Sequence, residues 1–272
     1  MKTQFDLPQF DSPVRRMALA GGLVAALALG GCMGAAGERP QAAPAPIAAD
    51  PKVLELAERA VQQNRLVDAR TLLERVFAAE PAHPRARLIM GEIHLASGAS
   101  DRAAHEFEAL VEHAELKALA WQGLGTARLR GGDQEGACQA LRQAVATDAN
   151  LWRAWNGLGY CHDTEGNWSA AEASYTRAIT LNPKAAWLYN NRGFSRMLQQ
   201  RLDVAVADFD RALKLDPNLE LAKHNLRLAL ARNGRYAQAM IGAAGKDAGR
   251  ALNNVGYVAM LNGEQARQLA PR

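Results

Sequence analysis

A repeat of 34 residues constrains this chain more than any other feature of its sequence. The repeat runs without slippage through five successive windows, and small residues fill two columns of each window. The windows are residues 50–83, 84–117, 118–151, 152–185 and 186–219. The eighth column holds Ala57, Gly91, Gly125, Gly159 and Gly193, and the twentieth holds alanine throughout. A fixed period of this length is typical of stacked supersecondary units that complete one another's cores, so we expect an elongated array.

Each window contains two apolar stretches with helical spacing, and a turn separates them. In window 152–185, Gly166 lies in the turn and is predicted to take the left-handed conformation that ends the first helix. The second helix is predicted over about residues 169–181, because Pro183 cannot continue it. Gly159 is expected to be small because the two helices cross closely there. Tyr175 is predicted to fill the seam to the next unit.

These columns resemble the tetratricopeptide repeat. The fourth window matches the pattern of that repeat at Trp155, Leu158, Gly159, Ala171, Tyr175, Ala178 and Pro183. The resemblance implies an all-α fold, a tetratricopeptide repeat solenoid in which antiparallel helix pairs form a right-handed superhelix. The first two windows match less closely, because Ala57 replaces the usual glycine and Glu115 replaces the usual proline.

The repeat register weakens after residue 219. Residues 220–239 keep a first helix and the start of a second, which predicts a partial repeat and extends the array over residues 50–239. Glycine and alanine crowd residues 240–249, a composition that holds a helix poorly, so we expect an irregular segment. A terminal partial repeat is predicted over residues 250–272, and terminal repeats are often atypical.

The N-terminus has the pattern of a secretory signal. Arg15 and Arg16 precede an apolar run over residues 17–29, which is too short to persist as a membrane helix. The run ends in Leu-Gly-Gly-Cys and resembles a bacterial lipoprotein signal over residues 1–31, which implies that Cys32 becomes the lipidated first residue. The alternative is an uncleaved anchor helix with a chance cysteine.

A tether and a location follow from the same resemblance. Residues 32–49 are rich in proline and alanine, so we expect an extended, semi-stiff tether. Met33 follows the cysteine, which by resemblance implies sorting to the outer membrane. The expected location is the bacterial cell envelope, lipid-anchored in the outer membrane and facing the periplasm.

Charge and motifs exclude several classes of function. The chain carries a net charge of +4, which is mild and includes no block of like charge, so nucleic acid is not an expected partner. The sequence lacks the phosphate-binding, zinc-protease, serine-hydrolase and dinucleotide motifs. We therefore expect no catalytic residue, cofactor, metal site or small-molecule substrate, and we predict that the protein is not an enzyme.

Cys138 and Cys161 lie in helices of adjacent windows, in columns that face the seam between units. A disulfide between them is compatible with a periplasmic location. Two buried thiols are the alternative, because free cysteine behaves as a small apolar residue. The sequence leaves both possibilities open.

The resemblance implies that the first helices line a concave groove that binds a protein partner. Ten residues are the candidates for this groove. They are Arg153, Asn156, Tyr160, Trp187, Asn190, Asn191, Phe194, Met197, His224 and Asn225. Aromatic rings and methionine could bury apolar side chains of an extended or helical peptide, and asparagine amides could pair with its backbone. Alternatively, Trp187 and Phe194 pack against the chain's own tether or C-terminal helices.

The lipoprotein signal, short tether and repeats together resemble the TadD family of Flp (Tad) pilus assembly lipoproteins. The resemblance implies a non-enzymatic scaffold at the outer membrane that assists assembly of the pilus secretin or its partners. Three alternatives keep the architecture and change the partner. They are a type IV pilus or type II secretion pilotin, an adaptor for peptidoglycan enzymes, and a subunit of polysaccharide export machinery.

Overall fold

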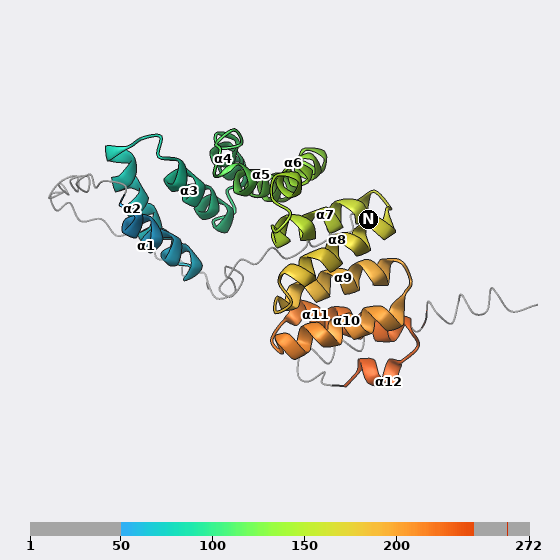
Figure 1. Cartoon of the computed structure of the whole chain (residues 1–272). Helices are drawn as coiled ribbons and strands as arrows, with labels where there is room; N and C mark the ends of the chain where they lie inside the picture. Colours follow the sequence, from blue (N-terminus) through green and yellow to red (C-terminus); the bar gives the residue numbers. More distant parts are fainter. Residues whose placement is uncertain (1–49, 242–259, 261–272) are drawn as a thin grey trace, which may run out of the picture. The chain divides into compact units, whose positions relative to one another are not determined.

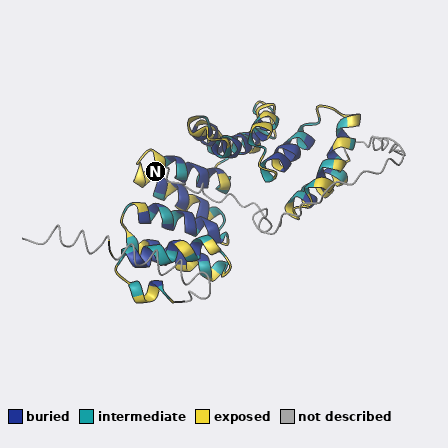
Figure 2. Ribbon diagram, turned by 180° about the vertical axis from the view of Figure 1, so that it is seen from behind, coloured by how far each residue is buried: buried dark blue, intermediate teal, exposed yellow. Residues whose placement is uncertain are grey.

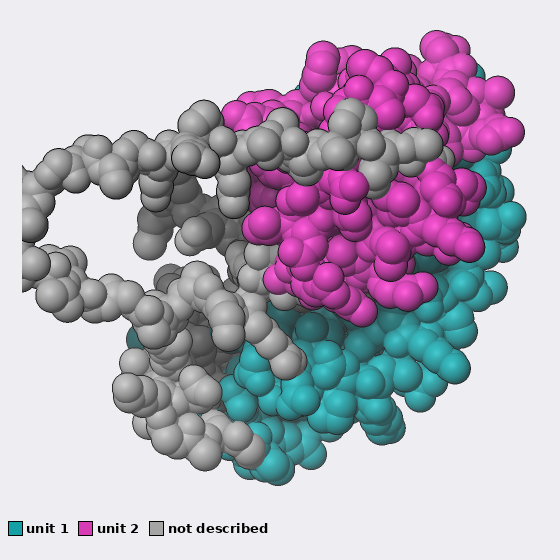
Figure 3. Space-filling model, turned by 90° about the vertical axis from the view of Figure 1, so that its left-hand side faces the viewer, with its two compact units in different colours: residues 1–11, 117–272 teal, residues 12–116 magenta. Residues whose placement is uncertain are grey.

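A computed structural model describes residues 50–241 and residue 260 of the chain. Within these residues the protein is all helical, with twelve helices and no strand. None of these helices is long and apolar enough to cross a membrane. The predicted signal, the tether and most of residues 240–272 lie outside the described residues. The chain divides into two compact units between residues 116 and 117 (Figure 3).

The unit before this boundary contains two helix pairs. They are α1 (Pro51–Gln62) with α2 (Leu66–Ala79), and α3 (Pro84–Ala96) with α4 (Ser100–Glu108). Leu54, Leu73, Val76, Ile89 and Ile93 are buried together in one core that three of these helices share. Helix α4 has 9 residues, whereas α6, α8 and α10 have 14 each, and residues 109–116 form turns instead.

The unit after the boundary continues the helix pairs in the same order (Figure 1). They are α5 (Lys117–Gly131) with α6 (Gln134–Thr147), α7 (Trp152–Thr164) with α8 (Trp168–Leu181), α9 (Ala186–Leu198) with α10 (Leu202–Leu215), and α11 (Glu220–Arg232) with the short α12 (Tyr236–Ala239). Each helix packs on the next, and each first helix also contacts the following first helix. The first helices α5, α7, α9 and α11 therefore form one continuous layer.

The turn between the two helices of each pair uses one backbone conformation. The residue at column fifteen has a positive φ in all five windows and in the partial repeat that follows them. These residues are Asn64, Gly98, Gly132, Gly166, Gln200 and Gly234, with φ between 59° and 89°. The prediction for Gly166 is confirmed, because its φ is 71°. Glycine takes this conformation without steric cost, and Asn is the residue that tolerates it next best.

The small column-eight residues are explained by contacts within each pair. A Cβ atom at Gly159 would lie 2.6 Å from the ring of Tyr175, and one at Gly193 would lie 2.8 Å from the ring of Phe209. The alanines of column twenty are completely buried. These contacts correct the prediction for Tyr175, whose ring fills the space inside its own pair. Figure 2 shows the buried residues on the sides of the helices that face one another.

Candidate partner-binding face on the first helices

Columns two, five, nine and thirteen of each window lie on one side of the first helix, because they are three or four residues apart. In α7, α9 and α11 these columns make a surface that we call the first-helix face. Its residues are Arg153, Asn156, Tyr160 and Thr164 in α7, Trp187, Asn190, Phe194 and Leu198 in α9, and Leu221, His224, Leu228 and Arg232 in α11. Seven of the ten residues predicted for the groove lie on this face.

Four asparagines of these helices bond to one another in a series that we call the amide ladder. Asn225 Nδ2 donates to Asn190 Oδ1 at 3.0 Å, and Asn191 Nδ2 donates to Asn156 Oδ1 at 3.0 Å. A longer bond of 3.4 Å, from Asn190 Nδ2 to Asn191 Oδ1, joins the two halves. In each of the two 3.0 Å bonds, the asparagine at column six of one repeat donates to the asparagine at column five of the repeat before it.

The amide ladder is buried, with each of its residues at most 6% exposed. The repeat columns predict these amides on an accessible floor, and this prediction is wrong, because the structure places them in contact with one another. They hold α7, α9 and α11 in a fixed register. One buried amide nitrogen, Asn156 Nδ2, has no hydrogen-bond partner in the structure.

Two further predicted groove residues pack inside the array. Trp187 is 7% exposed, and its ring centroid lies 5.2 Å from that of Trp152 at the start of α7. Met197 is 1% exposed and belongs to the core shared by α9, α10, α11 and α12. Both residues therefore contribute to the stacking of neighbouring repeats.

The remaining predicted residues are accessible. Tyr160 and Phe194 are half-buried at column nine, and Leu228 occupies the same column in α11 with the same partial burial. We call these three residues the apolar stripe. Partial burial raises the pKa of the Tyr160 hydroxyl. Arg153 and His224 are exposed on the same face, and the Arg153 guanidinium lies 4.2 Å from the ring centroid of Trp152.

Charge is distributed unequally between the two layers of the unit formed by residues 117–241. The first helices α5, α7, α9 and α11 hold nine Lys and Arg residues and two Asp and Glu residues. The second helices hold four Lys and Arg residues and five Asp and Glu residues. The mild net charge and the absence of a block of like charge do not reveal this asymmetry, which appears when the charges are counted by helix.

A partly buried ion-pair network, centred on the buried Asp208, joins the two layers around α9. Arg192 binds both carboxylate oxygens of Asp208, at 2.9 and 2.8 Å. Arg196 donates to Asp208 at 2.8 Å and also pairs with Glu172 of α8. The hydrogen bond from Arg196 lowers the pKa of Glu172. These side chains are structural, and no group of three or more His, Cys, Asp or Glu residues in the described part of the chain could hold a metal ion.

A second polar link joins three helices at Asp163. The Asp163 carboxylate accepts hydrogen bonds from the Tyr175 hydroxyl at 2.9 Å and from Ser195 Oγ at 2.6 Å. Burial raises the pKa of Asp163, although both hydrogen bonds act in the opposite direction. The carboxylate therefore ties α7 to α8 of its own pair and to α9 of the next.

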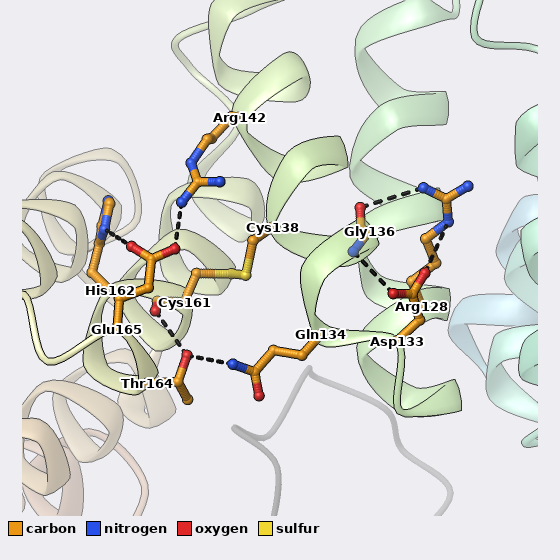
Figure 4. Close-up of a disulfide and its surroundings, with 10 residues drawn as sticks. All are labelled: Arg128, Asp133, Gln134, Gly136, Cys138, Arg142, Cys161, His162, Thr164 and Glu165. Carbon is orange, nitrogen blue, oxygen red and sulfur yellow. Dashed lines mark hydrogen bonds and ion pairs between the residues drawn. A yellow bond between two sulfur atoms is a disulfide. The ribbon is translucent and has the colours of Figure 1, made fainter.

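The third and fourth windows are joined by a disulfide between Cys138 of α6 and Cys161 of α7 (Figure 4). The sulfur atoms are 2.06 Å apart, and the Cα atoms are 5.8 Å apart. Polar contacts surround the bond, because Gln134 Nε2 donates to Thr164 Oγ1 at 2.8 Å and Arg142 pairs with Glu165. The seam between α6 and α7 is therefore held both covalently and by side-chain contacts.

Three family models, each described as a tetratricopeptide repeat, match residues 60–125, 152–185 and 186–219. These helix pairs are tetratricopeptide repeats. No curated protein matches the chain significantly. Tetratricopeptide repeat arrays stack into solenoids that present extended binding surfaces.

Three solved structures are similar to most of this chain. A TPR protein of Thermus thermophilus is 22% identical with a TM-score of 0.55, over 70% of this chain and 98% of that one. MamA of Desulfovibrio magneticus RS-1 is 18% identical with a TM-score of 0.49, over 62% and 95%. YrrB, described as a TPR protein with an unusual peptide-binding site, is 20% identical with a TM-score of 0.47, over 64% and 90%. At these identities the likeness concerns the fold alone.

Proposed function

We propose that this protein is a non-enzymatic scaffold that binds protein partners through the first-helix face. The observation that carries the proposal is the apolar stripe, in which Tyr160, Phe194 and Leu228 repeat at one column on three adjacent helices and stay partly exposed. Half-buried aromatic and aliphatic side chains are typical anchors of protein interfaces. The exposed Arg153 and His224 add polar contacts beside the stripe.

The second part of the proposal is the location. We propose that the chain is exported, lipidated at Cys32 and held at the outer membrane, with its repeats in the periplasm. The Leu-Gly-Gly-Cys sequence that ends at Cys32 supports lipidation. The disulfide between Cys138 and Cys161 supports export, because structural disulfides persist in oxidising compartments and are rare in the cytosol.

The third part is the pathway. We propose that the partner is the secretin of an Flp (Tad) pilus or a protein that assembles with it. The resemblance to the TadD lipoproteins supports this choice. Anchoring the scaffold at the membrane that also holds its partner would raise the effective concentration of the pair, so that a modest affinity for a short segment suffices.

The test is affinity capture of the intact protein from gently solubilised envelopes, followed by mass spectrometry. Two pairs of substitutions are compared, Arg153→Glu with His224→Glu on the first-helix face and Thr180→Glu with Lys214→Glu on α8 and α10, and both pairs change the net charge equally. We expect the secretin or pilus-assembly proteins to be captured by the unchanged protein and by the second pair, and to be lost with the first.

A parallel Cys32→Ser form tests the anchor, because it should leave the membrane fraction. Its persistent membrane association would contradict lipidation. Capture of peptidoglycan enzymes or polysaccharide export proteins in place of the secretin would overturn the proposed pathway. Capture that survives the first pair of substitutions would place the binding surface elsewhere on the molecule.

A further inference from the structure

The helix pair formed by α11 and α12 has one side on which a further helix can pack. In the unit formed by residues 117–241, each earlier pair is covered by the first helix that follows it. Within the described residues, no such helix covers α11 and α12. Helix α12 is also short, with 4 residues against 14 in α6, α8 and α10. We infer that residues 250–263 of this chain form a further first helix, which packs on α11 and α12 and extends the first-helix face by one repeat.

The sequence of residues 250–263 has the columns of a first helix when Gly256 is placed at column eight. Ala251 then falls at column three, where α3, α5, α7 and α11 each bury an alanine completely. Gly263 falls at column fifteen, the turn position that has a positive φ in the preceding repeats. Met260, the one residue described beyond residue 241, is helical. The segment therefore matches the first helices at both ends and in the middle.

The chain is long enough to bring this segment to α11. In this register the sixth repeat spans residues 220–248, which is 29 residues rather than 34. The rest of a full second helix beyond Ile241 would be about 12 Å long, and the axes of neighbouring helices lie about 10 Å apart. The nine peptide steps from Ile241 to Arg250 can span up to about 30 Å. So short a connection gives the segment a high effective concentration, which favours it as the occupant over a second copy or a separate partner.

One contact recurs wherever a second helix of this unit meets the next first helix. Column twenty-one of the second helix meets column ten or eleven of the first helix in all three described cases. Cys138 is bonded to Cys161, Glu172 pairs with Arg196, and Val206 shares a core with Ala229 and Leu230. The recurring contact therefore predicts which residue of α12 the segment should meet.

In the sixth repeat, column twenty-one is Met240, and columns ten and eleven of the further helix are Val258 and Ala259. Met240 is half-buried, whereas Val206 at the same column of α10 is 6% exposed. All three residues of the predicted contact are apolar, so packing Val258 and Ala259 against Met240 would remove apolar surface from water. The burial of Met240 would then approach that of Val206.

This packing would lengthen the apolar stripe. Tyr257 falls at column nine, the column of Tyr160, Phe194 and Leu228. The first-helix face would then offer four such sites in series and end in an aromatic ring, which is a typical anchor of protein interfaces. The role of Tyr257 rests on the proposed function, whereas the packing of residues 250–263 on α12 does not.

The test of the packing is disulfide formation between engineered cysteines in the mature chain, in its Cys32→Ser form. Met240→Cys with Val258→Cys copies the columns of the Cys138–Cys161 bond, so this pair should close within one chain. Met240→Cys with Tyr257→Cys is the matched control, because adjacent residues of a helix point about 100° apart. We expect the first pair to close at least about tenfold faster, measured by trapping of free thiols and mass spectrometry of the linked peptides.

Two results of this experiment would overturn the inference. Equal rates for both pairs would do so, because a segment without a fixed register brings either cysteine to position 240 alike. Linked dimers in place of the bond within one chain would also do so, and would identify a second copy as the occupant.

Hydrogen exchange provides a second measurement that needs no engineered cysteine. We expect the amides of residues 254–263 to be protected in the unchanged protein, and Met240→Asp to speed their exchange by at least about tenfold. Ala237→Asp is the control, because it adds the same charge to the exposed side of α12, at the column that holds Asp203 in α10. No protection in the unchanged protein, or the same exchange rates in both variants, would contradict the packing.

The packing and the proposed function fail separately. Tyr257→Ala should weaken capture of the envelope partner by a factor similar to that of Phe194→Ala. Loss with Phe194→Ala alone would remove Tyr257 from the first-helix face. If the cysteines at 240 and 258 close as expected while no partner is captured, the proposed function is wrong and the packing stands.

Discussion

The contact between Gly159 and Tyr175 gives a prediction whose sign can be worked out from the structure. An added Cβ at Gly159 would lie 2.6 Å from Tyr175 Cε1 and 2.7 Å from two further ring carbons. The ring cannot shift freely, since Tyr175 is 2% exposed and its hydroxyl donates to Asp163 at 2.9 Å. We therefore expect Gly159→Ala to destabilise the array, although alanine is the better helix former.

The magnitude is a difference between two effects. Overpacking a close-packed core costs about 1–3 kcal/mol, and replacing glycine by alanine inside a helix gains about 1 kcal/mol. The net loss should be about 1–2 kcal/mol in the free energy of unfolding. Leucine at this column does not by itself make room, because a Cβ added at Gly125 would lie 2.6 Å from Leu141 Cγ, but window 50–83 buries Ala57 and Leu73 together completely. In a Tyr175→Leu background, where the side chain is smaller and is not held by the hydrogen bond to Asp163, Gly159→Ala should therefore cost less.

The assay is a double-mutant cycle by urea unfolding under oxidising conditions, with circular dichroism as the probe. Gly159→Ala, Tyr175→Leu and the double variant should show a coupling of about 1–2 kcal/mol that favours the double variant. A matched control is Gly166→Ala, at a position with no atom within 4 Å of the added Cβ, which should destabilise in both backgrounds equally because φ is positive there. Additive effects of Gly159→Ala and Tyr175→Leu, or a stabilising Gly159→Ala, would refute the reasoning.

Three further predictions concern the links between helices. Replacing Cys138 and Cys161 by serine should lower the free energy of unfolding by about 3 kcal/mol, the value expected for the loop that this disulfide closes. In thermal unfolding, a reductant should destabilise the unchanged protein to the same extent. Asp208→Asn should cost about 3 kcal/mol in urea unfolding, because it weakens the pairing of a buried carboxylate with two partly buried arginines, and a loss below about 1 kcal/mol would contradict that role. Burial raises the pKa of Asp163 above its ordinary 3.8, so the stability that this group contributes is present below pH 3.8 and is lost as the pH rises through the raised pKa. Asp163→Asn should therefore flatten this part of the dependence of the unfolding free energy on pH. An unchanged pH profile in that variant would contradict the role given to Asp163.

The helices could be predicted from the sequence because each repeat column has a local cause. Glycine at column fifteen marks a turn that needs a positive φ. The small residue at position 159 indicates a close approach between the two helices of the pair, and in the structure the group that approaches Gly159 is the ring of Tyr175. Five windows in one register repeat these signals, so a deviation in one window does not obscure the pattern. The early end of α4 at Glu108 falls in a window that matched the repeat less closely.

The side-chain partners could not be predicted in the same way. Asn156 and Asn191 are far apart in sequence, and their hydrogen bond depends on how α9 is placed against α7, which a column pattern does not record. The same holds for Cys138 and Cys161, where seam-facing columns allowed either a bond or two thiols. Whether an amide is buried depends on how neighbouring repeats pack. A binding surface predicted from repeat columns therefore includes residues that the neighbouring repeat covers.

The central claim is that a protein partner lies on the first-helix face in the cell. The most direct measurement is photocrosslinking in living cells, with a benzophenone amino acid replacing Phe194 on this face or Thr180 on the exposed side of α8, followed by mass spectrometry. We predict that a secretin or pilus-assembly protein is crosslinked from position 194 and not from position 180. Crosslinking of the same proteins from both positions, or from position 180 alone, would contradict the account.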